Sequence, residues 1–231
     1  MSEYYTLLTS LPHLPKLDSG KVLPITRLAL DRRLSMLSEQ DSQQLQCLES
    51  LYFPEEDTLS QLSDRDVVRY WTKALGNLQS DVLKQRVYYQ LEMRSVIAAI
   101  RYREADMNHP EHFSGIGRWN GFIRRHWYEP MFSMDEFHPQ MAFTVRLLKK
   151  GFPGQAESAF LAHLWQDLFY CEKQQDFNFE AVACYVLRWG VLAKALKADA
   201  QKTRQIFDTM TNALIGSTSL HDDLEKEKTE S

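Results

Sequence analysis

Glycine and proline are scarce in this chain of 231 residues, which contains nine glycines and eight prolines. A sheet protein with many tight turns needs more of both, so their scarcity favours long helices. Cysteine is rare as well. Cys47, Cys171 and Cys184 are an odd number at unrelated spacings, which matches neither a disulfide framework nor a zinc-binding pattern. We expect reduced thiols in a cytosolic protein.

The sequence also lacks the uninterrupted run of about 18 apolar residues that a membrane-spanning helix needs. Its most apolar window, residues 179–196, contains Glu180, Arg188 and Lys194. The first residues show no basic and apolar pattern of a secretory signal. A formal charge of −4 gives no overall attraction to nucleic acid or to an anionic bilayer. We therefore expect a cytoplasmic protein that contacts a membrane only through another protein.

Apolar residues make up 44% of the chain and aromatic residues 12%, enough for a sizeable core. Ser38, Ser63 or Asp64, and Ser80 are the expected helix N-caps. The sequence predicts an all-α fold of packed helical bundles, in a curved or funnel-like array, after a short irregular N-terminal segment that is extended at residues 4–8. Helix start and stop signals predict helices at about 25–37, 39–53, 64–75, 81–107, 118–127, 139–150 and 155–175, with one or two more from residue 177.

The longest of these helices has apolar residues at helical spacing. Val82, Tyr89, Met93, Val96 and Ile100 follow one another at steps of seven, four, three and four. Such spacing indicates one helix face that packs against its neighbours.

The expected organisation has four parts. Residues 1–114 form an N-terminal helical bundle, and 115–138 an irregular connection with a short helix. Residues 139–215 form a C-terminal bundle, and the polar tail 216–231 is expected to be disordered.

Few residues suggest chemistry. His109 and His112 flank Glu111, but no third or fourth metal ligand can be named, and surface histidines are common. Gly115, Gly117 and Gly121 do not have the spacing of a dinucleotide fingerprint and follow a helix instead of a strand, so they predict a tight turn or a close helix approach. We expect no catalytic residue, no metal and no cofactor.

One basic and aromatic patch stands out, and its members are Arg118, Trp119, Arg124, Arg125, His126 and Trp127. Such a patch can bind nucleic acid or a protein partner. The negative net charge favours a protein partner, because nucleic-acid affinity rests mostly on neutralised phosphates.

Arginines also mark the long helix. Arg94 and Arg101 are one heptad apart and share a face, with Arg103 nearby. The simplest interpretation is a solvated helix surface with local ion pairs. The functional alternative is a face that binds acidic residues of a partner. With the patch, this gives the candidate interface residues Arg94, Arg101, Arg103, Trp119, Arg124, Arg125 and Trp127.

Three segments carry a resemblance to a known family. The stretch 177–214 resembles the last helical unit of the C-type stalk component of V/A-type rotary ATPases, and within 161–196 the matching residues include Trp165, Phe179, Glu180, Tyr185 and Leu187. Residues 90–107 resemble the end of another helical unit, with Arg101 and Arg103 at its terminal basic positions, although Arg94-Ser95 replaces the usual acidic-Asn pair. The opening YYTLLTSLPHLP is similar to an uncharacterised bacterial family, of about this size, encoded with these ATPases.

The resemblance implies a C-like (d-like) adaptor that links the central stalk to the membrane rotor ring and transmits torque for ATP-coupled H+ or Na+ transport. Its implied partners are the central-stalk subunits and the rotor ring, at the inner face of the membrane. Three alternatives stay open: an accessory or assembly factor of the same ATPase, a helical nucleic-acid-binding protein, and a hydrolase that uses His109 and His112.

Overall fold

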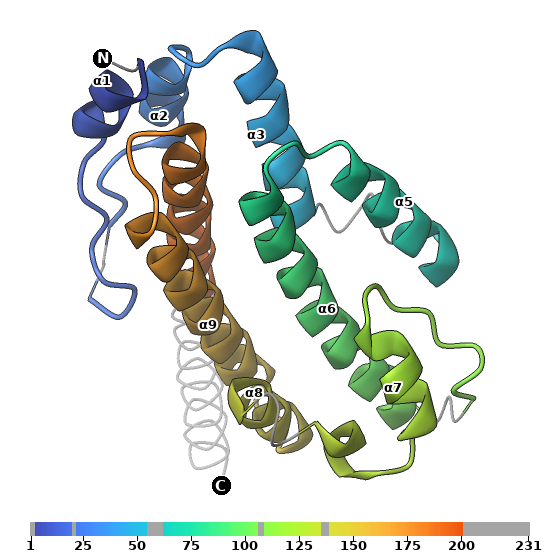
Figure 1. The fold of residues 1–231 in the computed structure, drawn as a ribbon. Helices are drawn as coiled ribbons and strands as arrows, with labels where there is room; N and C mark the ends of the chain where they lie inside the picture. Colours follow the sequence, from blue (N-terminus) through green and yellow to red (C-terminus); the bar gives the residue numbers. More distant parts are fainter. Residues whose placement is uncertain (1–2, 20–21, 55–61, 106–108, 135–138, 201–231) are drawn as a thin grey trace, which may run out of the picture.

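The structure is a computed structural model that describes residues 3–19, 22–54, 62–105, 109–134 and 139–200 (Figure 1). These residues form helices and connecting loops with no strand among them, as the sequence predicts. The helices are α1 (Glu3–Ser10), α2 (Arg27–Leu34), α3 (Glu39–Tyr52), α5 (Asp64–Gly76), α6 (Asp81–Glu104), α7 (Trp119–Arg125), the 3-10 turn η1 (Pro130–Ser133), α8 (Pro139–Lys149) and α9 (Pro153–Lys173). A further helix covers 179–200 and reaches the end of the described chain.

Serine N-caps fix the starts of three helices where the sequence places them. The hydroxyl of Ser38 accepts a hydrogen bond from the amide of Asp41, and Ser63 does the same for Asp66. Ser80 caps α6 by accepting from the amide of Leu83. Each cap satisfies a backbone donor that the first helical turn leaves without an intrahelical partner.

The first residues differ from expectation, because Glu3–Ser10 is a helix and not an extended segment. Aromatic and β-branched residues favour strands only where a sheet exists to receive them. Here Leu7 is buried in a helical core instead. The irregular segment lies farther along, where the Tyr185 hydroxyl donates a 2.7 Å hydrogen bond to the carbonyl of Pro12 and the Trp189 indole donates one of 2.9 Å to that of Ile25.

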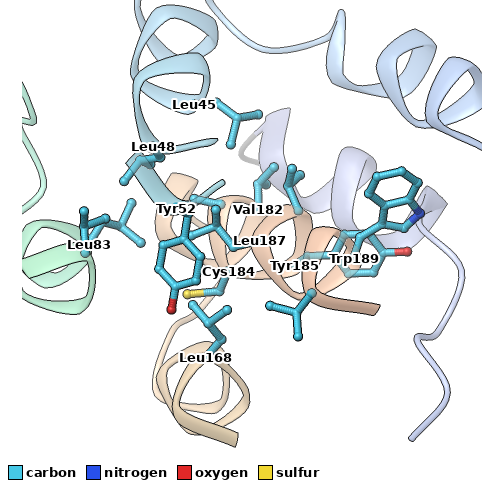
Figure 2. Close-up of a cluster of buried hydrophobic side chains, with 14 of the residues drawn as sticks. Leu45, Leu48, Tyr52, Leu83, Leu168, Val182, Cys184, Tyr185, Leu187 and Trp189 are labelled. Atoms are coloured by element: carbon cyan, nitrogen blue, oxygen red, sulfur yellow. The ribbon is translucent and has the colours of Figure 1, made fainter. Parts of the chain in front are cut away.

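The larger of two hydrophobic cores joins helices from both ends of the chain. Figure 2 shows Leu48 and Tyr52 of α3 beside Leu83 of α6, Leu168 of α9 and Leu187 of the last helix. All five side chains are at most 1% exposed. The three cysteines are free thiols, and Cys171 and Cys184 lie in this core.

The second core surrounds the other end of α6. Met93, Val96 and Ile100 pack there with Trp127 and Phe132, which belong to the segment between α6 and α8. Buried residues of the first core come from both sides of residue 115, and the second core spans residues 93–145. The division into 1–114, 115–138 and 139–215 stays a prediction, and the expected tail 216–231 lies outside the described residues.

α6 is the helix that both cores share. Of its predicted apolar stripe, Met93, Val96 and Ile100 are buried and Tyr89 is half-buried, while Val82 in the first turn is 38% exposed. Its polar contacts with α9 include a 2.7 Å ion pair between Arg86 and Asp167. Within the described ranges, no helix is both long and apolar enough to cross a bilayer.

Candidate functional site

A groove of about 900 Å³ follows the second half of α6. The α6 residues that line it fall at steps of three, four and seven, so they form one continuous stripe on the helix. The lining residues of this stripe are Arg94, Ser95, Ile97, Ala98, Arg101 and Tyr102, followed by Ala105 just after the helix end. The face that the sequence assigned to Arg94 and Arg101 is therefore the floor of the groove.

The opposite wall is the first half of α5. Asp64, Val67, Val68 and Trp71 line the groove at the same helical spacing. Leu75, near the other end of α5, is the one fully buried residue of this helix. Figure 1 shows α5 joined to α6 by a short connection and diverging from it toward Asp64. The divergence leaves the two facing stripes separated by a groove instead of a packed seam.

Helices α8 and α9 and the last helix complete the boundary. Leu148 and Phe160 add apolar surface, and Lys194 adds a cation. Among the described residues, the charged side chains of the lining are the basic Arg94, Arg101 and Lys194 and the acidic Asp64 and Glu157. These residues thus combine apolar surface with charges of both signs.

The three cations differ in their surroundings. Arg94 is half-buried, and its Nη2 donates a 3.0 Å hydrogen bond to the carbonyl of Tyr52 at the end of α3. Lys194 lies with its Nζ 5.4 Å from the centre of the Phe53 ring. Arg101 is exposed. Arg94 therefore also has a structural role, whereas Arg101 is directed toward solvent and available to a partner.

The loop that contains Gly115 and Gly117 turns the chain tightly over α6, as predicted for these glycines, whereas Gly121 lies inside α7. The hydroxyl of Ser95 accepts a 2.9 Å hydrogen bond from the amide of Ile116, and Glu92 accepts one of 2.8 Å from the amide of Arg118. Gly117 has φ +94°, and a Cβ there would lie 2.3 Å from Cγ of Glu92. Burial raises the pKa of Glu92, and the amide and guanidinium of Arg118 lower it to a smaller extent.

Trp127 is not a surface residue. Its ring is 1% exposed and packs at centroid distances of 5.5 to 6.0 Å from Tyr102, Phe113 and Phe132. Trp127 therefore belongs to the second core and not to the exposed part of the patch. Its position after Arg124, Arg125 and His126 gave the surface interpretation, but a tryptophan also buries a large area in a core.

Two further arginines of the predicted set hold the loops together. Nη1 of Arg103 donates to the carbonyls of Trp127 at 2.6 Å and Glu129 at 3.0 Å, and its guanidinium carbon lies 4.6 Å from the centre of the Phe132 ring. Arg124 donates to the carbonyl of Phe113 through Nε and Nη2. These side chains donate to carbonyls of the segment between α6 and α8, and the carbonyl of Glu129 also accepts from the amide of Phe132 in η1.

The remaining members of the patch lie at or near the surface of α7. Arg125 is exposed, and its Nε lies 3.3 Å from the carbonyl of Gly121 one turn back. Trp119 is half-buried, with the Arg118 guanidinium carbon 5.0 Å from its ring centre. The patch therefore does not form one contact surface, and none of its residues lines the groove.

His109 and His112 are exposed and lie side by side, with ring centroids 5.5 Å apart. Nδ1 of His109 is 3.2 Å from a carboxylate oxygen of Glu111. In the part of the chain that the structure describes, no group of three or more histidine, cysteine or acidic side chains is placed to hold a metal ion.

Comparison with known proteins adds no relative: no protein family, curated protein or solved structure matches this chain.

Proposed function

We propose that this chain is a non-catalytic adaptor of a V/A-type rotary ATPase, C-like (d-like) in role. It links the central stalk to the membrane rotor ring and transmits torque during ATP-coupled H+ or Na+ transport. The ATPase assignment rests on the resemblance of the three sequence segments. The protein-binding assignment rests on the groove along α6, which is the observation that carries the proposal.

The residues that carry the resemblance have structural roles that suit a rigid part. Glu180 accepts a 2.7 Å hydrogen bond from the α6 cap Ser80, which ties the last helix to the start of α6. Trp165 lies 4.3 Å from the guanidinium carbon of the buried Arg188, whose Nη1 is 2.6 Å from a carboxylate oxygen of Glu172. Links between helices distant in sequence stiffen a body that must pass force from one interface to another.

The groove offers a protein partner two rows of side chains at helical spacing, one on α5 and one on α6, and rows of this kind suit a helical segment of a partner. The nucleic-acid alternative relied on the patch around α7, in which Trp127 is buried and Arg124 is engaged with a loop carbonyl. Partner contact through the groove also agrees with a location at the inner membrane face through the complex.

Co-purification from native membranes at low ionic strength tests the proposal, with an affinity tag after Ser231. We expect recovery of the catalytic, central-stalk and ring subunits at a fixed ratio to this chain. Substoichiometric recovery with free stalk subunits only would identify an assembly factor instead. Recovery of no ATPase subunit would overturn the assignment.

A further inference from the structure

We propose that Cys171 and Cys184 are a redox-sensitive thiol pair, which hydrogen peroxide converts into a disulfide that links α9 to the last helix. The inference goes beyond the proposed function and does not depend on the ATPase assignment. It rests on the contact between the two thiols, on their burial and on the polar side chains that surround them.

The two cysteines face each other across a helical hairpin. Cys171 lies in the last turn of α9, and Cys184 lies near the start of the helix 179–200, which follows the loop 174–178. Their thiols share a hydrogen bond. The 2.6 Å ion pair between Glu172 and Arg188 joins the next residue of α9 to the next turn of the last helix, and so holds the hairpin in register. Contact between two thiols on adjacent helices is the first requirement of a disulfide.

The surroundings give the two thiols different reactivities. The hydrogen bond from Cys184 lowers the pKa of Cys171, and the nearby guanidinium of Arg86 acts in the same direction, while burial and the carboxylate of Asp167 oppose them. The same hydrogen bond, together with burial, raises the pKa of Cys184. The thiolate is the form that attacks an oxidant. Cys171 is therefore the thiol that reacts first, and Cys184 is the thiol that completes the disulfide.

The thiol pair lies inside the first core but close to its edge. Cys171 is 2% exposed and Cys184 is 0% exposed. Arg86, which contacts Cys171, has a side chain that is 34% exposed, and its ion-pair partner Asp167 is 15% exposed. One layer of side chains thus separates the thiols from solvent. Hydrogen peroxide is small enough to pass such a layer, whereas glutathione and protein thiols are not.

A buried hydroxyl beside the thiol pair has no partner of its own. The side chain of Tyr52 is fully buried, and within the described part of the chain its hydroxyl makes no hydrogen bond. Figure 2 shows the hydroxyl on the side of the Cys184 sulfur. Burial raises the pKa of Tyr52, and negative charge on Asp167 and Cys184 raises it further, which agrees with this proximity. The Tyr52 hydroxyl can therefore donate to an oxygen atom that is carried by the Cys171 sulfur.

The oxidation takes place in two steps. The Cys171 thiolate attacks one oxygen of the peroxide, so that an S–O bond forms and the O–O bond breaks. The hydroxide that leaves takes up the proton that Cys171 released, which gives a sulfenic acid and water. The Cys184 sulfur then attacks the Cys171 sulfur, an S–S bond forms, the S–O bond breaks, and a second water leaves with the Cys184 proton. The two thiols lose two electrons to one molecule of peroxide.

Oxidation of the purified full chain with hydrogen peroxide tests this. Alkylation in denaturant followed by peptide mass spectrometry should find a cross-link between residues 171 and 184, with a loss of about 2 Da that dithiothreitol reverses. Cys47 is the internal control, because it is more exposed than either thiol and burial raises its pKa. We expect Cys47 to remain a free thiol. Earlier oxidation of Cys47, a disulfide that includes it, or no cross-link between 171 and 184 would overturn the inference.

Alanine variants separate the roles of the two thiols. Cys184→Ala should stop at a sulfenic acid on Cys171, which dimedone captures, whereas Cys171→Ala should give neither sulfenic acid nor disulfide. Cys47→Ala should behave as the wild type. Capture of a sulfenic acid at Cys184 would overturn the assigned order. If a variant does not fold, the peptide map of the wild type decides alone. Hydrogen exchange in the oxidised wild type should be slower across 171–184, and faster exchange there would show that the bond forms only in an opened hairpin.

Tyr52→Phe tests the role of the hydroxyl. This variant should be as stable as the wild type and should form the disulfide about five-fold more slowly, because one donor to the sulfenic oxygen is lost. The matched control is Tyr70→Phe on α5, where the ring is 43% exposed and the rate should not change. A loosened core would expose the thiols and raise the rate, so the sign of the effect separates the two causes. An unchanged or faster rate in Tyr52→Phe would overturn this part of the inference.

Discussion

The main-chain amide of Arg118 donates a hydrogen bond of 2.8 Å to Oε1 of Glu92, a carboxylate whose side chain is only 2% exposed. The contact holds the loop after Phe113 against α6, beside the groove. It joins a buried negative charge to a single backbone donor and to a guanidinium whose Nε is 3.7 Å away. Burial is the larger influence on this carboxylate, and it raises its pKa.

Two substitutions of Glu92 should separate the contribution of its hydrogen bond to stability from the contribution of its charge. Glu92→Gln keeps an oxygen acceptor without the charge, so its free energy of unfolding at neutral pH should equal or exceed that of the wild type. Glu92→Ala leaves the amide of Arg118 without its acceptor and should lose about 1–3 kcal/mol. Urea denaturation of both variants measures the difference.

The same carboxylate predicts a pH dependence. Its pKa is higher in the folded than in the unfolded chain, so the folded state binds the proton more tightly. The stability from this group is fully present below the unfolded-state pKa and is lost as pH rises through the folded-state pKa. Relative to Glu92→Gln, the wild type should therefore become less stable as pH rises across that window. If the unfolding free energy of the wild type stayed constant or rose relative to that of Glu92→Gln as pH increased, the prediction would be contradicted.

Gly117 and Gly121 should respond in opposite directions to alanine. At Gly117 the positive φ and the 2.3 Å approach to Glu92 Cγ are both unfavourable for a Cβ, so Gly117→Ala should lower the unfolding free energy by about 2–4 kcal/mol. At Gly121, inside α7, no heavy atom lies within 4 Å of the added Cβ. Gly121→Ala should stabilise by roughly 0.5–1 kcal/mol. Equal effects at the two positions in urea unfolding would show that the turn does not press on Glu92.

Gly190 lets the last helix approach the end of α3. A Cβ at Gly190 would lie 2.4 Å from Cε2 of Phe53. Gly190→Ala should therefore destabilise by about 1–3 kcal/mol although alanine is the better helix former. Phe53→Leu removes the ring, so the double variant should lose less stability than the sum of the two single changes. Strictly additive losses in thermal or urea unfolding would argue against the contact.

Arg103 and Arg101 test which arginines of α6 are structural. Arg103→Met removes the donors to the carbonyls of Trp127 and Glu129 and should lower stability by about 1–3 kcal/mol. Arg101→Met, at an exposed site on the same helix, should change it by less than about 0.5 kcal/mol. Hydrogen exchange should become faster around residues 126–134 in the first variant only.

Local signals predicted much of this fold. The serine caps at Ser38, Ser63 and Ser80 start helices because a side-chain acceptor and a following helical pattern suffice for a cap. Residues 3–10 were mispredicted, since their helix depends on burial of Leu7 against segments distant in sequence. The heptad spacing of Arg94 and Arg101 predicted that they share a face of α6, and both line the groove.

The groove itself could not be predicted in the same way. It exists because α5 diverges from α6, and the angle between two helices is set by tertiary packing and not by the periodicity of either. The same limit explains Trp127. Its neighbours Arg124 and Arg125 are exposed, and only the fold shows that the ring between Tyr102 and Phe132 is inside.

The two cores also set an order of assembly on the ribosome. The buried residues of the second core all lie between Met93 and Val145, whereas those of the first extend from Leu7 to Leu192. Segments close in sequence meet sooner than distant ones, and chains fold from the N-terminus as they emerge. The second core can therefore close while the last helix is still being synthesised. The N-terminal helices can pack on one another and on α5 and α6 before then, but their core is complete only when residues 179–192 arrive.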